Sequence, residues 1–254
     1  MSTNTKIAVV TGGSRGLGKN MALALAKKGI DVVLTYNSRK EDADAVVAEI
    51  EQLGRKAAAL QLDAGAVASF ETFAGQLTAT LTTTFGTDHF DFLINNAGTA
   101  GNSPIGQTKE AEFDQLVNIH FKGVLFLTEQ LLPIQNDGGR IINISSGLAR
   151  FTSPGRAVYG SLKGAIETLS IYMAKELGTR GIAVNVVAPG AIETDFGGGV
   201  VRDNPDVNKH IAAITALGRV GLPEDIGGVV AFLCTDEARW INAQRIEVSG
   251  GMNL

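Results

Sequence analysis

Hydrophobic and polar positions along the chain predict strands and helices in strict alternation. Short apolar or β-branched runs predict strands at Lys6–Val10, Asp31–Tyr36, Ala57–Leu62, Asp91–Asn95, Arg140–Ser145, Ile182–Ala188 and Arg245–Val248. Between them, segments of helical composition, several ending at a glycine, predict helices at Lys19–Lys28, Glu41–Leu53, Ala66–Phe85, Lys109–Ile119, Phe121–Ile134, Ala157–Leu177 and Pro223–Leu233. The repeated β–α order predicts an α/β fold: a parallel sheet with helices on both faces.

The number of predicted strands separates two α/β architectures. Seven strands favour a single-domain Rossmann fold with a doubly wound sheet over a TIM barrel, which needs eight βα units. The sequence contains no linker, repeat or low-complexity stretch that would mark a boundary. We therefore expect residues 1–254 to form one dinucleotide-binding and catalytic domain.

Composition narrows the class of protein. Of 254 residues, 44% are hydrophobic and 19% are charged, which indicates an ordered globular protein. The formal net charge of −4 and the lack of a long basic run argue against a nucleic-acid surface. Cys234 is the single cysteine, so the chain forms no internal disulfide, which suits a reducing compartment. The N-terminal sequence has no signal-peptide pattern, and no apolar run reaches about 20 residues, so we expect a cytoplasmic protein without a membrane span.

A glycine-rich stretch, T-G-G-S-R-G-L-G at 11–18, lies between the first predicted strand and the first predicted helix. Glycines at this point permit a tight turn and close approach of the backbone to a pyrophosphate, which the helix N-terminus then attracts. The spacing differs from G-x-G-x-x-G, so the standard dinucleotide fingerprint is not matched. The strand–loop–helix context still predicts a dinucleotide site that includes Gly12, Ser14, Arg15, Gly16, Leu17 and Gly18.

The residues after the second predicted strand indicate which dinucleotide is bound. An NAD site usually has an acidic residue there, which binds the ribose hydroxyls. In this chain residues 36–39 are Y-N-S-R, and the nearest acid, Asp31, is at the other end of the strand. Arginines suit a 2′-phosphate. The sequence thus predicts NADP(H) in preference to NAD(H), bound at this end by Arg15, Asn37, Ser38 and Arg39.

Tyr159 and Lys163 are four residues apart in the predicted helix Ala157–Leu177, so both lie on one helix face. An ammonium beside a phenol favours the phenolate and lowers a pKa that is ordinarily about 10. A tyrosine tuned in this way exchanges a proton with a substrate oxygen near neutral pH. Ser146, at the end of the preceding predicted strand, is placed to bond to the same oxygen.

In the order and spacing of its motifs, nearly the whole chain resembles the short-chain dehydrogenase/reductase family. The motifs are T-G-G-S-R-G-L-G at 11–18, N-N-A-G at 95–98, Ser146 with Tyr159-x-x-x-Lys163, P-G-A-I-E-T at 189–194, and a tail with G-R-V-G-L-P-E-D-I-G and I-E-V-S-G-G-M. The similarity is greatest to 3-oxoacyl-(acyl-carrier-protein) reductases and related ketoreductases.

The resemblance implies an NADPH-dependent oxidoreductase that transfers a hydride between the nicotinamide and a carbonyl or secondary alcohol. The alternatives are an alcohol, sugar or steroid dehydrogenase of the same family and, from a different class, a dinucleotide-sensing protein without turnover. The serine, tyrosine and lysine of the motif argue against the sensor, because a sensor needs no proton donor.

The resemblance also implies roles for individual residues. Tyr159 is the acid/base, Lys163 lowers its pKa and holds the nicotinamide ribose, and Ser146 orients and polarises the substrate carbonyl. Further residues line the cofactor: Asp63 at the adenine, then Asn95, Ala97, Gly98, Pro189, Gly190, Ile192 and Thr194. Alternative roles remain for Asn95 and Asn96, which would then only brace a strand end, and for Asp63, which would only cap the next helix.

One position departs from the family pattern. The fourth catalytic residue of the family is an Asn, typically three residues before a glycine, but counting back from Gly123 gives His120. Asn118 is two residues too early. His120 therefore occupies the Asn position, either as part of a proton relay or merely as a helix residue that faces the cofactor pocket.

Substrate choice is expected in Thr194–Ala216, whose glycines at 197–199 suit a mobile lid; an ordinary surface loop is the alternative. Arg150, Phe151 and Arg156 are candidates for the pocket mouth, where the arginines would meet an anionic substrate or carrier; a solvated surface role is the favoured alternative for the arginines. The expected substrate is a small carbonyl compound or alcohol.

Two further expectations concern partners and metals. The family resemblance implies a homotetramer, with the segment around Trp240–Leu254 at a subunit interface. The three histidines, His89, His120 and His210, match no ligand spacing, so no metal is predicted.

Overall fold

The computed structural model describes residues 5–254, and within them it contains one sheet of parallel strands in the order β3-β2-β1-β4-β5-β6-β7. The strands are β1 (Ile7–Val10), β2 (Asp31–Tyr36), β3 (Ala57–Gln61), β4 (Phe90–Asn95), β5 (Gln135–Ile144), β6 (Ala183–Pro189) and β7 (Arg245–Val248). The predicted Rossmann-type fold is confirmed. Residues 1–4 of the expected domain lie outside the described residues.

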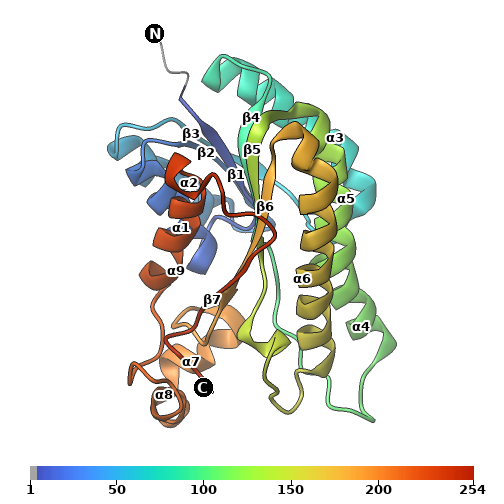
Figure 1. Ribbon diagram of the computed structural model, residues 1–254, viewed down its shortest axis with the longest axis vertical. Coiled ribbons are helices and arrows are strands. Elements are labelled where there is room, and N and C mark those ends of the chain that lie inside the picture. The colour runs from blue at the N-terminus through green and yellow to red at the C-terminus, as the bar shows by residue number, and fades with distance from the viewer. Residues whose placement is uncertain (1–4) are drawn as a thin grey trace.

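Helices cover both faces of the sheet (Figure 1). One face carries α1 (Gly16–Lys27), α2 (Lys40–Gln52) and α9 (Pro223–Leu233), and the other carries α3 (Phe70–Thr80), α4 (Glu110–Val117), α5 (Gly123–Leu131) and α6 (Ala157–Leu177). Two short helices, α7 (Val200–Asp203) and α8 (Pro205–Ala213), lie beside the C-terminus. In the described part of the chain, no helix has the length and apolarity needed to cross a membrane.

Strand β1, in the middle of the sheet, is apolar throughout because both faces of the sheet are buried there. In β1, Ala8 and Val10 pack into the core beneath α1, α2 and α9, while Ile7 and Val9 pack into the core beneath α3, α5 and α6. Successive side chains of a strand point to opposite faces, so a doubly covered strand needs apolar residues at every position. Full burial of one aliphatic side chain stabilises the fold by about 1.5–3 kcal/mol.

The predicted separation of helices Lys109–Ile119 and Phe121–Ile134 is wrong. A π-helical turn, Asn118–Lys122, joins α4 directly to α5, so the chain continues as one rod through His120. Such turns are rare and are frequently found at functional sites. Helical composition alone does not distinguish a π turn from a break between two helices.

Two other boundaries differ from the prediction. The first helix begins at Gly16, inside the glycine-rich stretch, because its first turn is part of the tight βα connection. Strand β5 begins at Gln135, whereas the predicted strand began at Arg140, because the polar residues 135–139 gave no strand pattern. The pairing of β5 with β4 shifts register between Phe90 and Phe92.

Candidate active site

A cleft of about 550 Å³ lies at the carboxyl ends of the strands, formed by the turns that follow β1 to β6. Ligands of open α/β sheets bind in the crevice at this edge. Nearly all predicted site residues line the cleft: Gly12, Ser14, Arg15, Gly16, Leu17, Gly18, Asn37, Ser38, Arg39, Asp63, Ala97, Gly98, His120, Ser146, Tyr159, Lys163, Pro189, Gly190, Ile192 and Thr194.

The glycine-rich turn forms a cradle whose backbone leaves no room for side chains. Gly12 has a φ of +63°, and a Cβ added to it would lie 3.0 Å from the Cα of Ala97. A Cβ on Gly18 would collide with the carbonyl oxygen of Gly12. At the N-terminus of α1 the cap residue, Arg15, makes no side-chain hydrogen bond to the helix. The free amides and the helix dipole at this point fit a pyrophosphate.

Of the arginines that line the cleft, one lies in the glycine-rich turn and one lies after the end of β2. Arg15 pairs with Asp195, and the Nη1 of Arg39 lies 3.4 Å from Asp42, yet the two arginine side chains are 52% and 59% exposed. Residues 36–39, which line the cleft after β2, include no acid. Asp31 lies at the opposite end of β2, where it accepts a hydrogen bond from the amide of Lys56 at 2.9 Å. This arrangement fits a 2′-phosphate better than two free ribose hydroxyls.

Tyr159, Lys163 and Ser146 line one region of the cleft. The first turn of α6 carries Tyr159 and the second carries Lys163, whose Nζ lies 5.5 Å from the centroid of the phenol ring. Lys163 is buried, donates to the carbonyl of Ile144 at 2.8 Å, and has its pKa lowered to about 8 by burial. The Ser146 hydroxyl oxygen accepts from the amide of Leu148 at 3.2 Å, which leaves its proton free to be donated.

Burial raises the pKa of Tyr159 to about 12, while a hydrogen bond with Ser146 and the charge of Arg156 act in the opposite direction. This is the reverse of the shift predicted from the spacing to Lys163. Exclusion of water penalises the phenolate, and in this structure that penalty outweighs the hydrogen bond with Ser146 and the charge of Arg156. Tyr159 therefore carries its proton at neutral pH, the state that a proton donor requires.

The enoyl-(acyl carrier protein) reductase family model matches residues 12–253. The chain is 40% identical to an uncharacterized oxidoreductase of Methylorubrum extorquens, with 97% of each chain covered. It is 35% identical to the 3-oxoacyl-[acyl-carrier-protein] reductase FabG of Staphylococcus aureus, with 98% of this chain and 99% of the relative covered.

Solved structures agree with these matches. The short-chain dehydrogenase/reductase of Serratia marcescens is 32% identical with a TM-score of 0.90, and 98% of each chain is covered. The chain belongs to the short-chain dehydrogenase/reductase family. It is an oxidoreductase of that family.

Two further structures of known activity are similar to this short-chain dehydrogenase/reductase. The promiscuous reductase LugOII, which catalyses keto-reduction at C1 in lugdunomycin biosynthesis, is 38% identical with a TM-score of 0.93 and full coverage of both chains. The angucycline C-6 ketoreductase LanV, solved with bound NADP, is 34% identical with a TM-score of 0.93 over 98% of this chain and 96% of its own.

His120, in the position where the family has an asparagine, is buried beside Tyr159, with ring centroids 5.2 Å apart and planes at 85°. Its Nε2 lies 2.8 Å from the carbonyl oxygen of Thr99 and 3.3 Å from the Thr99 amide nitrogen; we assign the proton to Nε2 because the contact with the carbonyl oxygen is the shorter one. Nδ1 is then a bare acceptor, buried without a partner among residues 5–254. Burial and the charge of Lys163 lower the pKa of His120 to about 3, so the ring is neutral.

Gly98 makes the imidazole position possible, because a Cβ there would lie 2.8 Å from the Cε1 atom of His120. The sequence pattern identified Gly98 as a cofactor residue. Its contact with the ring shows that it also accommodates the larger side chain in the asparagine position.

Asn95 lies outside the cleft, which corrects the prediction that it lines the cofactor. Its amide donates to the Thr128 hydroxyl at 3.1 Å and to the Asn143 side chain at 2.9 Å, in the core between β4, β5 and α5. Asn96 lines the cleft instead and donates to the carbonyls of Thr11 at 2.8 Å and Gly12 at 3.2 Å. The bracing role that the sequence left open for Asn95 is the one it has.

Two residues that line the cleft, Phe196 and Arg156, were not among the predicted catalytic or cofactor-binding residues. Phe196, two residues after the P-G-A-I-E-T motif, has its ring centroid 6.2 Å from that of Tyr159. Arg156, predicted only at the pocket mouth, lines the cleft and donates to the carbonyl of Gly101. Among the described residues no group of three His, Cys, Asp or Glu side chains is arranged to hold a metal ion.

Proposed function

We propose that this protein is an NADPH-dependent ketoreductase. The observation that carries the proposal is the pairing, within one cleft, of a glycine cradle and two exposed arginines with the group Ser146, Tyr159 and Lys163. The reductase names of its relatives support the direction of the reaction, and relatives solved with NADP and NADPH support the choice of cofactor.

The proposed mechanism divides the reduction between cofactor and protein. When bound, NADPH supplies the hydride that reaches the carbonyl carbon. Ser146 donates a hydrogen bond to the carbonyl oxygen and holds it in place, and Tyr159 transfers its phenolic proton to that oxygen. The ammonium of Lys163 stabilises the phenolate that remains. One hydride and one proton are added, so the ketone becomes a secondary alcohol; in the reverse direction Tyr159 accepts the proton.

Each part of the cleft has a proposed role in holding the cofactor. The amides around Gly12–Gly18 bind the pyrophosphate, and Arg15 and Arg39 bind the 2′-phosphate with Ser38 and Asn37. Asp63 faces the adenine, while the nicotinamide end is held by Ala97, Gly98, Lys163, Pro189, Gly190, Ile192 and Thr194.

His120 is proposed as a neutral positioning group and not as a carrier of protons. A proton on Nδ1 would have no acceptor among the described residues, and the pKa of about 3 keeps the ring neutral at working pH. The bond from Nε2 to Thr99 ties the turn after β4 to the π-helical turn, beside Tyr159.

The proposed substrate is a flat, largely apolar ketone. Phe196 packs beside Tyr159, and the other apolar residues that line the cleft include Ala100, Leu148, Val200 and Val201. LanV, whose structure was solved with NADP and rabelomycin, is 34% identical, which supports a polycyclic substrate. A 3-oxoacyl thioester is the second candidate, supported by the 35% identity to FabG.

The segment Thr194–Ala216 is proposed as the lid over this substrate. Gly197, Gly198 and Gly199 all have positive φ, and Asp195 pairs with Arg15 across the cleft. We also propose a homotetramer, supported by Trp240 and Leu254, which are 95% and 94% exposed in the single chain.

The decisive experiment measures NADPH oxidation with a polycyclic aromatic ketone and with a 3-oxoacyl thioester. Tyr159→Phe removes the proton donor, so kcat should fall by about 10³-fold while NADPH binding, followed by fluorescence, stays unchanged. Tyr172→Phe is the matched control, since Tyr172 lies on the same helix and is 64% exposed.

The wild-type enzyme should use NADPH in preference to NADH. The ratio of kcat/KM for the polycyclic ketone to that for the 3-oxoacyl thioester shows which of the two substrate classes is preferred. Retained turnover in Tyr159→Phe, or a preference for NADH, would contradict the proposal.

A further inference from the structure

The segment 145–150, which carries Ser146, is held at both of its ends by charged groups. Ser146 caps a short 3₁₀ turn, Gly147–Ala149, and its hydroxyl accepts from the amide of Leu148. A single turn of this kind has little stability of its own. The amide of Ser145 donates to the carbonyl of Val187 at 2.8 Å, and its hydroxyl lies 3.3 Å from the carbonyl oxygen of Lys163. Side-chain contacts with charged groups add to these bonds at Ser145 and at Arg150.

Glu167 holds the first end. The buried hydroxyl of Ser145 donates to the Oε1 atom of Glu167 at 2.6 Å. Glu167 lies on α6, one turn beyond Lys163 and two turns beyond Tyr159. This contact ties the strand end next to Ser146 to the helix that carries the other two members of the proposed catalytic group.

Glu247, on β7, holds the second end. Arg150 donates to both of its carboxylate oxygens, each at 2.8 Å, and also to the carbonyl of Met252 at 3.0 Å. Burial alone would raise the pKa of Glu247, but hydrogen bonds from Arg150, Ser249 and Arg245 lower it to about 2. The carboxylate is therefore ionised throughout the physiological pH range. A bidentate pair of this kind fixes orientation as well as distance.

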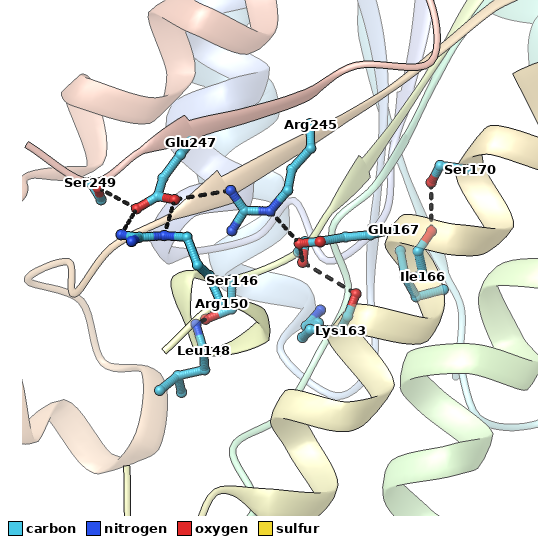
Figure 2. A network of polar contacts seen from close by, with 11 residues as sticks. Ser146, Leu148, Arg150, Lys163, Ile166, Glu167, Ser170, Arg245, Glu247 and Ser249 are labelled. Atoms are coloured by element: carbon cyan, nitrogen blue, oxygen red, sulfur yellow. Dashed lines mark hydrogen bonds and ion pairs between the residues drawn. The ribbon is translucent and has the colours of Figure 1, made fainter. Parts of the chain in front are cut away.

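Arg245 joins the two ends. Its Nε donates to Glu167 at 2.7 Å and its Nη1 donates to Glu247 at 2.9 Å. Figure 2 shows Arg245 between the two carboxylates, with Arg150 also bound to Glu247. Two arginines and two glutamates balance in charge, and none of the four lines the cleft.

We propose that Glu167, Arg245, Glu247 and Arg150 form a charged clamp that positions Ser146 against Tyr159 and Lys163. The clamp residues are positioning residues, because they reach the substrate only through Ser146. The inference rests on the proposed function, in which Ser146 holds the carbonyl oxygen. A displacement of about 1 Å at a reacting group lowers a rate by up to about a hundredfold.

The clamp is tested first by Glu167→Gln. Glutamine keeps the shape of the side chain but loses the charge that attracts Arg245, so kcat should fall by about tenfold, with the KM for NADPH unchanged. Glu176→Gln is the matched control: the same substitution on the same helix, at an exposed residue without a hydrogen bond or ion pair to any of residues 5–254. An unchanged kcat in Glu167→Gln would overturn the proposal.

Arg245 provides an independent test. Arg245→Met should lower kcat at least as much as Glu167→Gln, and Arg245→Lys should restore only part of it, since an ammonium does not reproduce the fork that spans two carboxylates. Thermal unfolding of both variants identifies any loss that comes from a misfolded chain. Full activity in a folded Arg245→Met enzyme would contradict the clamp.

A double-mutant comparison separates positioning from general destabilisation. If Glu167 acts through Ser146, Glu167→Gln should have no further effect on single-turnover rates in a Ser146→Ala background. An equal tenfold loss in both backgrounds would show that Glu167 acts elsewhere, which would overturn the inference. Failure of the clamp and failure of the proposed function remain distinguishable, because the proposed function is tested by turnover in Tyr159→Phe and by the preference for NADPH over NADH.

Discussion

Ser146 links the charged clamp to the proposed catalytic centre. The pKa values of the ionisable groups are shifted for different reasons in these two regions. In the clamp each charge faces an opposite charge, so the pKa of Glu247 is lowered to about 2 and that of Arg150 is raised. In the centre single groups are buried without a counter-charge, so the pKa of Lys163 is lowered to about 8 and that of Tyr159 is raised to about 12.

The clamp is therefore suited to fixing positions, and the catalytic centre is suited to proton transfer. Pairing favours the ionised form of both partners and fixes their distance, whereas burial without a counter-charge favours the neutral form of a group. His120 belongs to the second kind: it is buried, neutral and only half hydrogen-bonded. The following substitutions and pH changes test whether the two regions differ as described.

The largest effect is expected at Lys163. Lys163→Met removes the cation that stabilises the phenolate, so kcat should fall by about 10³-fold, far more than for any clamp residue. The exposed Lys175, on the same helix, provides the control Lys175→Met. A loss no greater than that of Arg245→Met in the same assay would remove the distinction between the two regions.

The second effect concerns stability in acid. An unfolded His takes up a proton below about pH 6.5, but folded His120, with its pKa of about 3, does not. Stability is therefore lost as the pH falls below 6.5, by about 2 kcal/mol at pH 5. Urea unfolding at pH 7 and pH 5 should show this loss in the wild type and a smaller one in His120→Asn.

The exposed His210 provides the control for this experiment. His210→Asn should retain the wild-type loss, and an identical loss in His120→Asn would show that His120 is not buried in its neutral form.

The smallest effect is the pH dependence of the rate. Because the pKa of Lys163 is lowered to about 8, its ammonium is lost as the pH rises through 8, and kcat for reduction should fall by about fivefold between pH 8 and pH 9. Lys163→Arg should lose this limb of the pH profile, since arginine keeps its charge. A flat wild-type profile up to pH 10 would indicate that Lys163 does not need its charge.

Local sequence patterns predicted much of the fold and many of the residues that line the cleft. The bounds of β2, β7, α6 and α9 match the prediction, because apolar runs and glycine or proline boundaries act within the segment itself. The turns that follow parallel strands all meet at one edge of the sheet, so the order of the motifs was enough to gather the predicted residues into one cleft.

Tertiary contacts decided the remaining features. Whether Asn95 or Asn96 faces the cleft depends on the phase of β4, and the direction of the Tyr159 pKa shift depends on how much water the surrounding chain excludes. The clamp joins residues from η5 (Gly147–Ala149), α6 and β7 that are distant in the sequence. The sequence alone predicted most of the groups that line the cleft at the carboxyl ends of the strands, because periodicity and turn chemistry are local properties of the chain. Charge state and orientation followed only from the packed structure, because burial and pairing depend on residues that folding brings together.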